Sequence, residues 1–304
     1  MKKSMLAVVL AAGLMVIGCG GTSGTQKTAP APAMAIAGSP GSDSAQGLAG
    51  APALGTTYQM EAALSYDFLT LDPGDVDATS LNLGFSYYWK PLNNDDTPVG
   101  LQEFMQKATK AGVELWFISP DVGDDETAWE LAANYAVTED RRLIAEAAVN
   151  GKYGFGDIVL GGNDWFGVRL GAKYYILDTL TAGLSYGVSR DKEAEVSIDE
   201  VIISGEYAVQ LGGRWLDAGL SVYRYLVEGS NTTTIGIDLT YYVLKELGVN
   251  VMYARTGGDG EADTFGVGAK YYYGPFAFGL MYRSLDEDGG MEVSDIGLNV
   301  EFRF

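Results

Sequence analysis

The chain has 304 residues, a formal net charge of −20, one cysteine and no histidine. The missing histidine excludes a Ser/His/acid triad, a histidine-activated cysteine nucleophile and an imidazole-ligated metal site. A single cysteine excludes an intramolecular disulfide, and the acidic balance excludes nucleic acid as a partner. An enzyme would have to work with carboxylates alone, and no pair of acids stands out. We therefore expect no enzymatic activity, no cofactor and no metal centre.

Residues 1–18 have the pattern of a secretion signal, with two lysines followed by an apolar run too short to span a bilayer. The residues Val16-Ile17-Gly18-Cys19 resemble the lipobox of bacterial lipoproteins, in which the cysteine is lipidated after cleavage. Gly20, in place of aspartate, resembles the pattern that is sent on to the outer membrane. This resemblance implies a lipid anchor at Cys19 and the lipoprotein-sorting machinery as a partner. The alternative is an ordinary signal that is cut further on, so that Cys19 is lost.

Residues 19–56 combine this anchor with a Gly/Ala/Ser/Pro-rich stretch that carries almost no charge. Such a composition cannot bury a core and predicts a flexible linker. Its roughly 37 residues would span about 30–36 Å as a random coil. That length joins a lipid anchor to the base of a folded domain; a plug inside that domain is the alternative.

From residue 57 to residue 304, apolar and polar residues alternate with a period of two. In 164–177, for example, Phe166, Val168 and Leu170 share one face, while Arg169 and Lys173 share the other. The pattern predicts an all-β domain, an antiparallel up-and-down barrel of about 14 strands with a range of roughly 12–16. The predicted strands cover 57–69, 79–90, 112–119, 127–138, 141–152, 164–177, 179–190, 199–211, 214–226, 232–244, 246–256, 263–273, 276–284 and 293–304.

The connections alternate between tight turns, such as 212–213 and 274–275, and longer acidic or Gly-rich segments, such as 191–198 and 285–292. Membrane barrels have short periplasmic turns and longer outer loops. An even number of strands then places both the C-terminus and the start of the first strand on the periplasmic side, where a lipid anchor belongs.

One long connection, 91–111, falls on the side of the short turns. Within it Leu101, Phe104, Met105 and Ala108 follow helical spacing. We expect a short amphipathic helix over 97–110 that lies beneath the barrel; the alternative, which applies if the parity is wrong, is a segment that folds into the lumen as a constriction.

Charge is segregated between the two faces of the strands. The apolar face is nearly free of charge, as a lipid-facing surface requires, because a midplane Arg or Lys costs about 2–4 kcal/mol there. Aromatic residues near the short turns are expected to form an interfacial belt, and they include Tyr87-Tyr88-Trp89, Tyr174-Tyr175, Tyr241-Tyr242, Tyr271-Tyr272-Tyr273, Trp215 and Phe276. The residues expected to line the lumen are Glu61, Glu114, Glu130, Arg142, Glu146, Arg169, Lys173, Glu206, Asp238, Lys270, Glu301 and Arg303.

Many glycines fall on the inward face, which predicts a narrow water-filled lumen. They are Gly167, Gly171, Gly183, Gly187, Gly236, Gly266, Gly268, Gly279 and Gly297. The alternative is that these glycines relieve curvature while Tyr88, Tyr223, Tyr242 and Tyr272 fill the space. In the same way, the inward charges either set a field across a pore or satisfy one another in salt bridges.

The alternating strands, the secretion signal and the closing residues Leu298–Phe304 resemble bacterial outer-membrane barrels. In that class a final aromatic such as Phe304 resembles the signal read by the barrel-assembly machinery. The stretch Phe85–Leu92, which leads into a longer turn with a helix, is similar to proteobacterial sequences of the porin type. The resemblance implies an outer-membrane location and passive diffusion of small hydrophilic solutes or ions. Acidic outer loops predict cation preference and contact with lipopolysaccharide. The alternative function is a non-conducting structural or surface-interaction barrel.

Overall fold

The computed structural model describes residues 57–72, 76–93, 97–120, 125–154, 165–191, 197–227, 230–258, 261–287 and 291–304. The predicted signal 1–18, the anchor at Cys19 and the linker to residue 56 lie outside these ranges. Within them, no helix has the length and hydropathy to cross a bilayer.

The fold consists of fourteen strands and one short helix, α2 (Gln102–Met105). Each predicted strand corresponds to an observed one, with boundaries that agree within three residues. The strands are β1 (Thr57–Asp72), β2 (Val76–Asn93), β3 (Lys110–Pro120), β4 (Glu126–Ala136), β5 (Leu143–Gly154), β6 (Trp165–Leu177), β7 (Leu180–Asp191), β8 (Ser197–Leu211), β9 (Arg214–Val227), β10 (Ser230–Leu244), β11 (Leu247–Gly258), β12 (Ala262–Tyr273), β13 (Phe276–Glu287) and β14 (Met291–Arg303).

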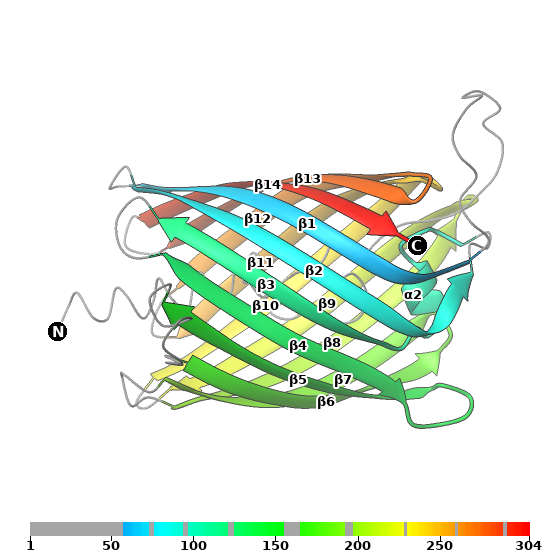
Figure 1. Ribbon diagram of the computed structural model, residues 1–304, viewed down its shortest axis with the longest axis horizontal. Coiled ribbons are helices and arrows are strands. Elements are labelled where there is room, and N and C mark those ends of the chain that lie inside the picture. The colour runs from blue at the N-terminus through cyan, green and yellow to red at the C-terminus, as the bar shows by residue number, and fades with distance from the viewer. Residues whose placement is uncertain are drawn as a thin grey trace.

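The strands form one closed antiparallel barrel in which each pairs with its sequence neighbours (Figure 1). The barrel closes where β1 pairs with β14, in a register that runs from Glu61 opposite Arg303 to Asp72 opposite Glu292. The amide of Phe304 also donates to the carbonyl of Met60 at 2.9 Å. Closure gives every strand two hydrogen-bonded neighbours, which is the condition for strands surrounded by hydrocarbon.

The two ends of the barrel differ. At the end that carries the C-terminus, two residues separate β6 from β7, β8 from β9, β10 from β11 and β12 from β13; we call it the turn end. The start of β1 lies at this end too, because Glu61 pairs with Arg303. The opposite end, the loop end, carries connections of up to ten residues, such as the one between β5 and β6. The sequence predicted this arrangement, in which the C-terminus and the start of the first strand lie at the end with the short turns.

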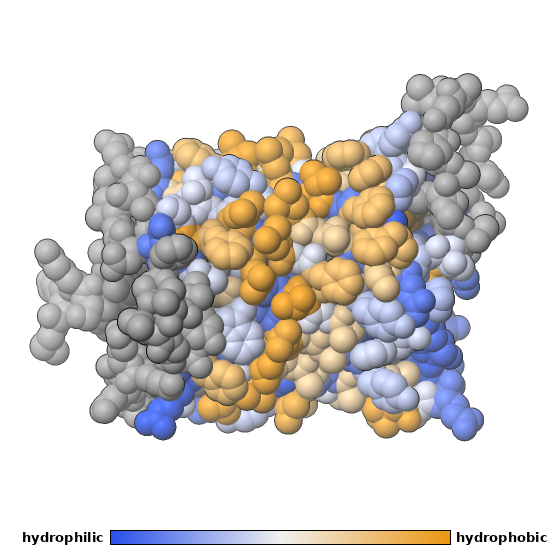
Figure 2. Space-filling view, viewed as in Figure 1, coloured by the Kyte–Doolittle hydropathy of each residue, from blue (hydrophilic) through white to orange (hydrophobic). Residues whose placement is uncertain are grey.

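The faces of the wall are those of a membrane barrel and the reverse of a soluble protein. Along β12, Phe265, Val267 and Tyr271 are exposed on the outside, whereas Lys270 and Tyr272 are buried on the inside. The same alternation recurs on every side of the barrel, and large apolar residues such as Leu170 and Leu298 are more than half exposed. Figure 2 shows the resulting apolar band between more hydrophilic ends. An apolar surface of this extent needs a lipid environment to cover it.

The predicted aromatic belt is only half correct. Trp89, Tyr174, Tyr241 and Tyr271 face outward near the turn end, as expected. Their sequence neighbours Tyr88, Tyr175, Tyr242 and Tyr272 point inward and are almost completely buried, and Trp215 also packs inside. Successive residues of a strand point to opposite faces, so each aromatic doublet places one ring in the belt and the other in the interior.

The inward glycines provide room for neighbouring side chains. A Cβ atom at Gly171 would lie 2.6 Å from the Cβ of Ser185, and one at Gly266 would lie 2.6 Å from the Cγ of Met252. The carboxylate of Asp67 would lie 2.5 Å from a Cβ at Gly297. Side chains from adjacent strands therefore occupy the space beside these three glycines.

Candidate functional site: the interior of the barrel

The interior is the only surface on which the described strands gather charged groups along their whole length. All but one of the twelve predicted lining residues lie on the inward register of a strand. Arg142 is the exception, because it lies in the turn between β4 and β5 and pairs with Asp140 at 3.5 Å. The residues on the inward register are Glu61, Glu114, Glu130, Glu146, Arg169, Lys173, Glu206, Asp238, Lys270, Glu301 and Arg303.

Basic groups on the wall are neutralised by acids on nearby strands. On β6, Arg169 contacts Glu130 of β4 at 3.3 Å and Glu200 of β8 at 3.7 Å. Lys173, four residues further along β6, contacts Glu206 of β8 at 3.5 Å. These pairs run along the wall between strands two apart and do not cross the lumen.

Carboxylates outnumber the basic groups on part of the wall. Glu114 on β3 lies directly opposite Glu130 on β4, so two inward acids share one cross-strand position. Asp217 on β9 and Asp238 on β10 add further inward acids. An excess of fixed negative charge in a low-dielectric enclosure raises the local concentration of cations.

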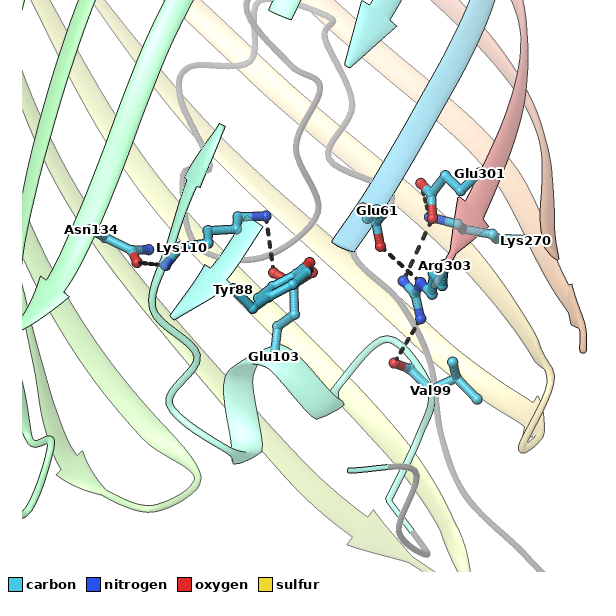
Figure 3. A network of polar contacts seen from close by, with 9 residues as sticks. All are labelled: Glu61, Tyr88, Val99, Glu103, Lys110, Asn134, Lys270, Glu301 and Arg303. Atoms are coloured by element: carbon cyan, nitrogen blue, oxygen red, sulfur yellow. Dashed lines mark hydrogen bonds and ion pairs between the residues drawn. The ribbon is translucent and has the colours of Figure 1, made fainter. Parts of the chain in front are cut away.

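A second cluster lies where the barrel closes (Figure 3). The guanidinium of Arg303 donates to Glu61 at 2.8 Å and lies 3.5 Å from Glu301, which also pairs with Lys270. The same guanidinium lies over the ring of Tyr272, at 4.8 Å from its centroid. A buried arginine is tolerated only when its charge and its donors are matched in this way.

The segment 97–109 lies inside the turn end of the barrel. Val99, Leu101, Phe104 and Ala108 each have less than 5% of their surface exposed. Their neighbours lie on the inward face of strands from all around the wall. Three apolar clusters join the segment to the wall: Leu101 and Phe104 with Ile144, Tyr175, Ala208 and Tyr242; Val99 with Tyr272 and Ala277; and Ala108 with Tyr58, Tyr88 and Leu92.

The prediction of a helix over 97–110 beneath the barrel is therefore wrong, both in the position of the segment and in the length of the helix. Only residues 102–105 are helical. Lys107 adopts a left-handed conformation, with φ of 50°, which ends the helix. The apolar spacing that predicted a helix is real, but its side chains pack against an enclosing wall and not along one face. The structure agrees with the alternative in placing the segment inside the lumen, although the parity is the predicted one.

Polar bonds hold this segment to widely separated strands. The carbonyl of Val99 accepts from Arg303 at 3.3 Å, and that of Phe104 accepts from the hydroxyl of Tyr175 at 3.0 Å. At the outer edge of the segment, Lys107 pairs with Asp178 in the β6–β7 turn at 2.8 Å. The segment is thus anchored to β14, to β6 and to a turn.

Glu103 is the charged centre of the segment. Its carboxylate accepts from the hydroxyl of Tyr88 and pairs with Lys110 at 3.1 Å (Figure 3). Burial raises the pKa of Glu103, while the charge of Lys110 opposes that change. Sequence reasoning did not include Glu103 or Lys110 in the site, because both lie in a connection whose position it could not fix.

Sequence reasoning also missed an ion-pair cluster on β13, β14 and β1. Arg283 pairs with Asp295 and lies 3.5 Å from Asp67. Continuing the alternation of β13 beyond Met281 places Arg283 inside, so the signal was present in the pattern. The predicted strand 276–284 already contained Arg283, but its partners Asp67 and Asp295 lie on two other strands, which alternation within one strand does not reveal.

The predicted assembly signal, Phe304, is the last residue of the chain. Its carbonyl accepts from the amides of Gln59 and Met60, and its ring stacks on Phe302 with centroids 5.2 Å apart. The side chain is about half exposed and belongs to the outward aromatic surface at the turn end. This geometry leaves the ring accessible, and recognition by the assembly machinery remains a prediction.

No protein-family model and no curated protein matches this sequence. Solved structures do match the fold. The outer membrane protein Omp33 of Acinetobacter baumannii superposes with a TM-score of 0.53 at 15% identity, over 82% of this chain and 100% of that one. A bacterial polysaccharide outer membrane secretin has a TM-score of 0.51 at 9% identity, over 81% and 99%. The monoaromatic hydrocarbon channel CymD has a TM-score of 0.51 at 10% identity, over 81% and 89%. These likenesses show that the chain has the fold of outer-membrane β-barrels.

Proposed function

We propose that the chain is an outer-membrane channel of the porin kind, through which small hydrophilic solutes or ions diffuse passively. The observation that carries this proposal is a closed barrel that is apolar outside and charged inside. A wall that only needed to be stable has no requirement for a charged interior, because burying charge is costly. The same proposal makes the protein a conduit and not an enzyme.

In this proposal the turn end faces the periplasm. The first strand begins there, at Thr57, so a linker over 19–56 that leaves a lipidated Cys19 would join the barrel on the periplasmic side. The acidic interior supports cation preference. The assembly and sorting machineries are the expected partners during biogenesis.

The segment 97–109 sets the conductance in this account. Because it fills the turn end with buried side chains, the channel is narrowest at its periplasmic mouth. The same packing supports a second function, a non-conducting barrel with a structural or surface-interaction role, in which the segment seals the lumen permanently.

Planar-bilayer recording separates the two functions. We expect small or infrequent conductance steps from the wild-type protein, and larger ones when Leu101 and Phe104 are both replaced by Ala. The matched control replaces Phe278 and Leu280, which face outward on β13 and leave the segment untouched. The control is expected to conduct as the wild type does. Absence of conductance from all three forms would rule out the channel and leave the structural barrel.

A further inference from the structure

Basic side chains gather on one part of the outward face near the loop end. Among the described residues whose side chains are placed, they are Arg190 on β7, Arg224 on β9 and Arg255 on β11, all exposed. Each lies within three residues of the last residue of its strand. Outward positions at the same end of other strands carry acids, such as Asp263 on β12 and Glu292 on β14. In a chain with net charge −20 this basic group needs an explanation.

Arg190 lies beyond the hydrocarbon level. Arg224 lies level with Tyr186, because both Arg224 and Tyr186 are opposite Val201 of β8. Tyrosines mark membrane interfaces, and Tyr186 and Tyr253 face outward on the strands that carry Arg190 and Arg255. Arg190 follows Tyr186 by four residues. At about 3.3 Å per residue and a tilt of roughly 40°, it lies about 10 Å further along the barrel axis. That position corresponds to the lipid headgroups.

The three arginines differ in their partners. Arg255 is neutralised by Glu261 at 3.3 Å and by Asp263 at 3.9 Å. Arg224 donates to the side-chain oxygen of Asn231 at 3.2 Å and, within the described parts of the chain, forms no ion pair. For Arg190 these parts of the chain provide no acidic partner either.

Asp199, on the intervening strand β8, lies between these two arginines on the outward face and accepts from the hydroxyl of Tyr186 at 2.7 Å. Among the described residues it forms no ion pair with either arginine. Arg190 on β7 and Arg224 on β9 therefore present two positive charges, with the single carboxylate of Asp199 between them.

We propose that the outward face of β7–β9 near the loop end binds the phosphates of an outer-leaflet glycolipid, lipopolysaccharide, through Arg190 and Arg224. The two strands flank β8, on which Arg190 lies opposite Ser197 and Arg224 lies opposite Val201, four residues further along, so the Cα atoms of the arginines are about 16 Å apart. Both side chains are long and exposed, so each guanidinium can reach one of the two phosphates of a single headgroup. A guanidinium offers a planar pair of donors to phosphate, which makes arginine suited to this contact. The proposal depends on the outer-membrane location and not on conduction.

Native mass spectrometry of the detergent-solubilised barrel tests the proposal, with diphosphorylated lipid A and its fully dephosphorylated form as probes. Replacing both Arg190 and Arg224 by Gln is expected to weaken binding of the phosphorylated lipid about tenfold or more. The matched control, Arg255→Gln, removes an outward arginine that already has acidic partners, so binding should change by less than about twofold. The dephosphorylated lipid should bind equally to wild type and variants.

Two results would overturn the proposal. One is unchanged binding by the double variant; the other is an equal loss with Arg255→Gln, which would indicate a general charge effect. Each variant is first shown to be folded by the different gel mobility of boiled and unboiled samples. A barrel that binds the lipid but fails to conduct would contradict the channel function and leave this site intact.

Discussion

Arg303, the penultimate residue of the chain, donates from Nε to the carboxylate of Glu61 at 2.8 Å, and these two residues lie directly opposite each other where the last strand meets the first. The same guanidinium also donates to the carbonyl of Val99, so one side chain links the two closing strands to the segment 97–109.

We expect Arg303→Gln to lower the free energy of unfolding by about 3–5 kcal/mol, because it leaves the buried carboxylate of Glu61 without its cation. Urea titration in detergent, followed by the gel mobility of unboiled samples, measures the effect. Arg142→Gln is the control, since its ion pair with Asp140 is largely exposed to solvent, which screens it, and contributes little to stability. Similar losses in the two variants would show that the closure pair has no special role.

Gly171→Ala is expected to destabilise the barrel by about 1–3 kcal/mol through overpacking. The new methyl group would lie 2.6 Å from the Cβ of Ser185 and 3.1 Å from the carbonyl oxygen of Leu184, neither of which moves freely. The matched inward control is Gly84→Ala, whose methyl group would make only ordinary contacts, at 3.5 Å from Ala63. The two variants are compared by the same urea titration. Equal stability of both would mean that the wall adapts more readily than close packing implies.

The channel should become more conducting as the pH rises. Burial raises the pKa of Glu103 above its ordinary value near 4.5, and the groups that face it are Tyr88, Lys110, Glu61 and Arg303. A site with a raised pKa binds its proton more tightly when the segment is docked. Docking is therefore favoured at pH values below the ordinary pKa, and this advantage is lost as the pH rises through the raised pKa. Conductance measured across that range should increase, and Glu103→Gln should abolish the dependence. A pH dependence that persists in Glu103→Gln would assign it to another group.

Reversal potentials under a KCl gradient test the charge of the lumen. We expect the wild-type protein to prefer cations. Replacing both Glu114 by Gln and Asp238 by Asn should reduce this preference, because both acids point from the wall into the lumen. The control, Asp199→Asn, removes an acid on the outward face of β8, where it contacts the hydroxyl of Tyr186. Anion preference of the wild-type protein would contradict the proposed filter.

Sequence reasoning could predict the wall of this barrel because its signal is local and repeated. Alternation along β12 or β14 assigns each side chain to a face without knowledge of any other strand, and turn lengths give the parity. That is why Arg169, Lys173 and Lys270 were correctly placed inside. Alternation also sends the two rings of each tyrosine doublet to opposite faces, so a doublet cannot be assigned as a whole to the outward belt.

What the sequence could not predict depends on contacts between distant segments. The partners of Phe104 come from β5, β6, β8 and β10, so no local pattern identifies them. The ion pairs of Arg169 depend equally on which strands lie two apart in the closed barrel. Spacing alone could not distinguish a helix under the barrel from a segment within it.

The central claim is that the apolar face of the wall touches hydrocarbon while the polar face does not, and a nitroxide scan along β14 tests it most directly. Single cysteines at residues 296–300, in a chain with Cys19 replaced by Ser, are spin-labelled and reconstituted into lipid vesicles. We predict that collision with oxygen, which concentrates in hydrocarbon, is high at Ile296, Leu298 and Val300 and low at Gly297 and Asn299. Uniform exposure of all five labels to a water-soluble nickel complex would contradict the membrane barrel.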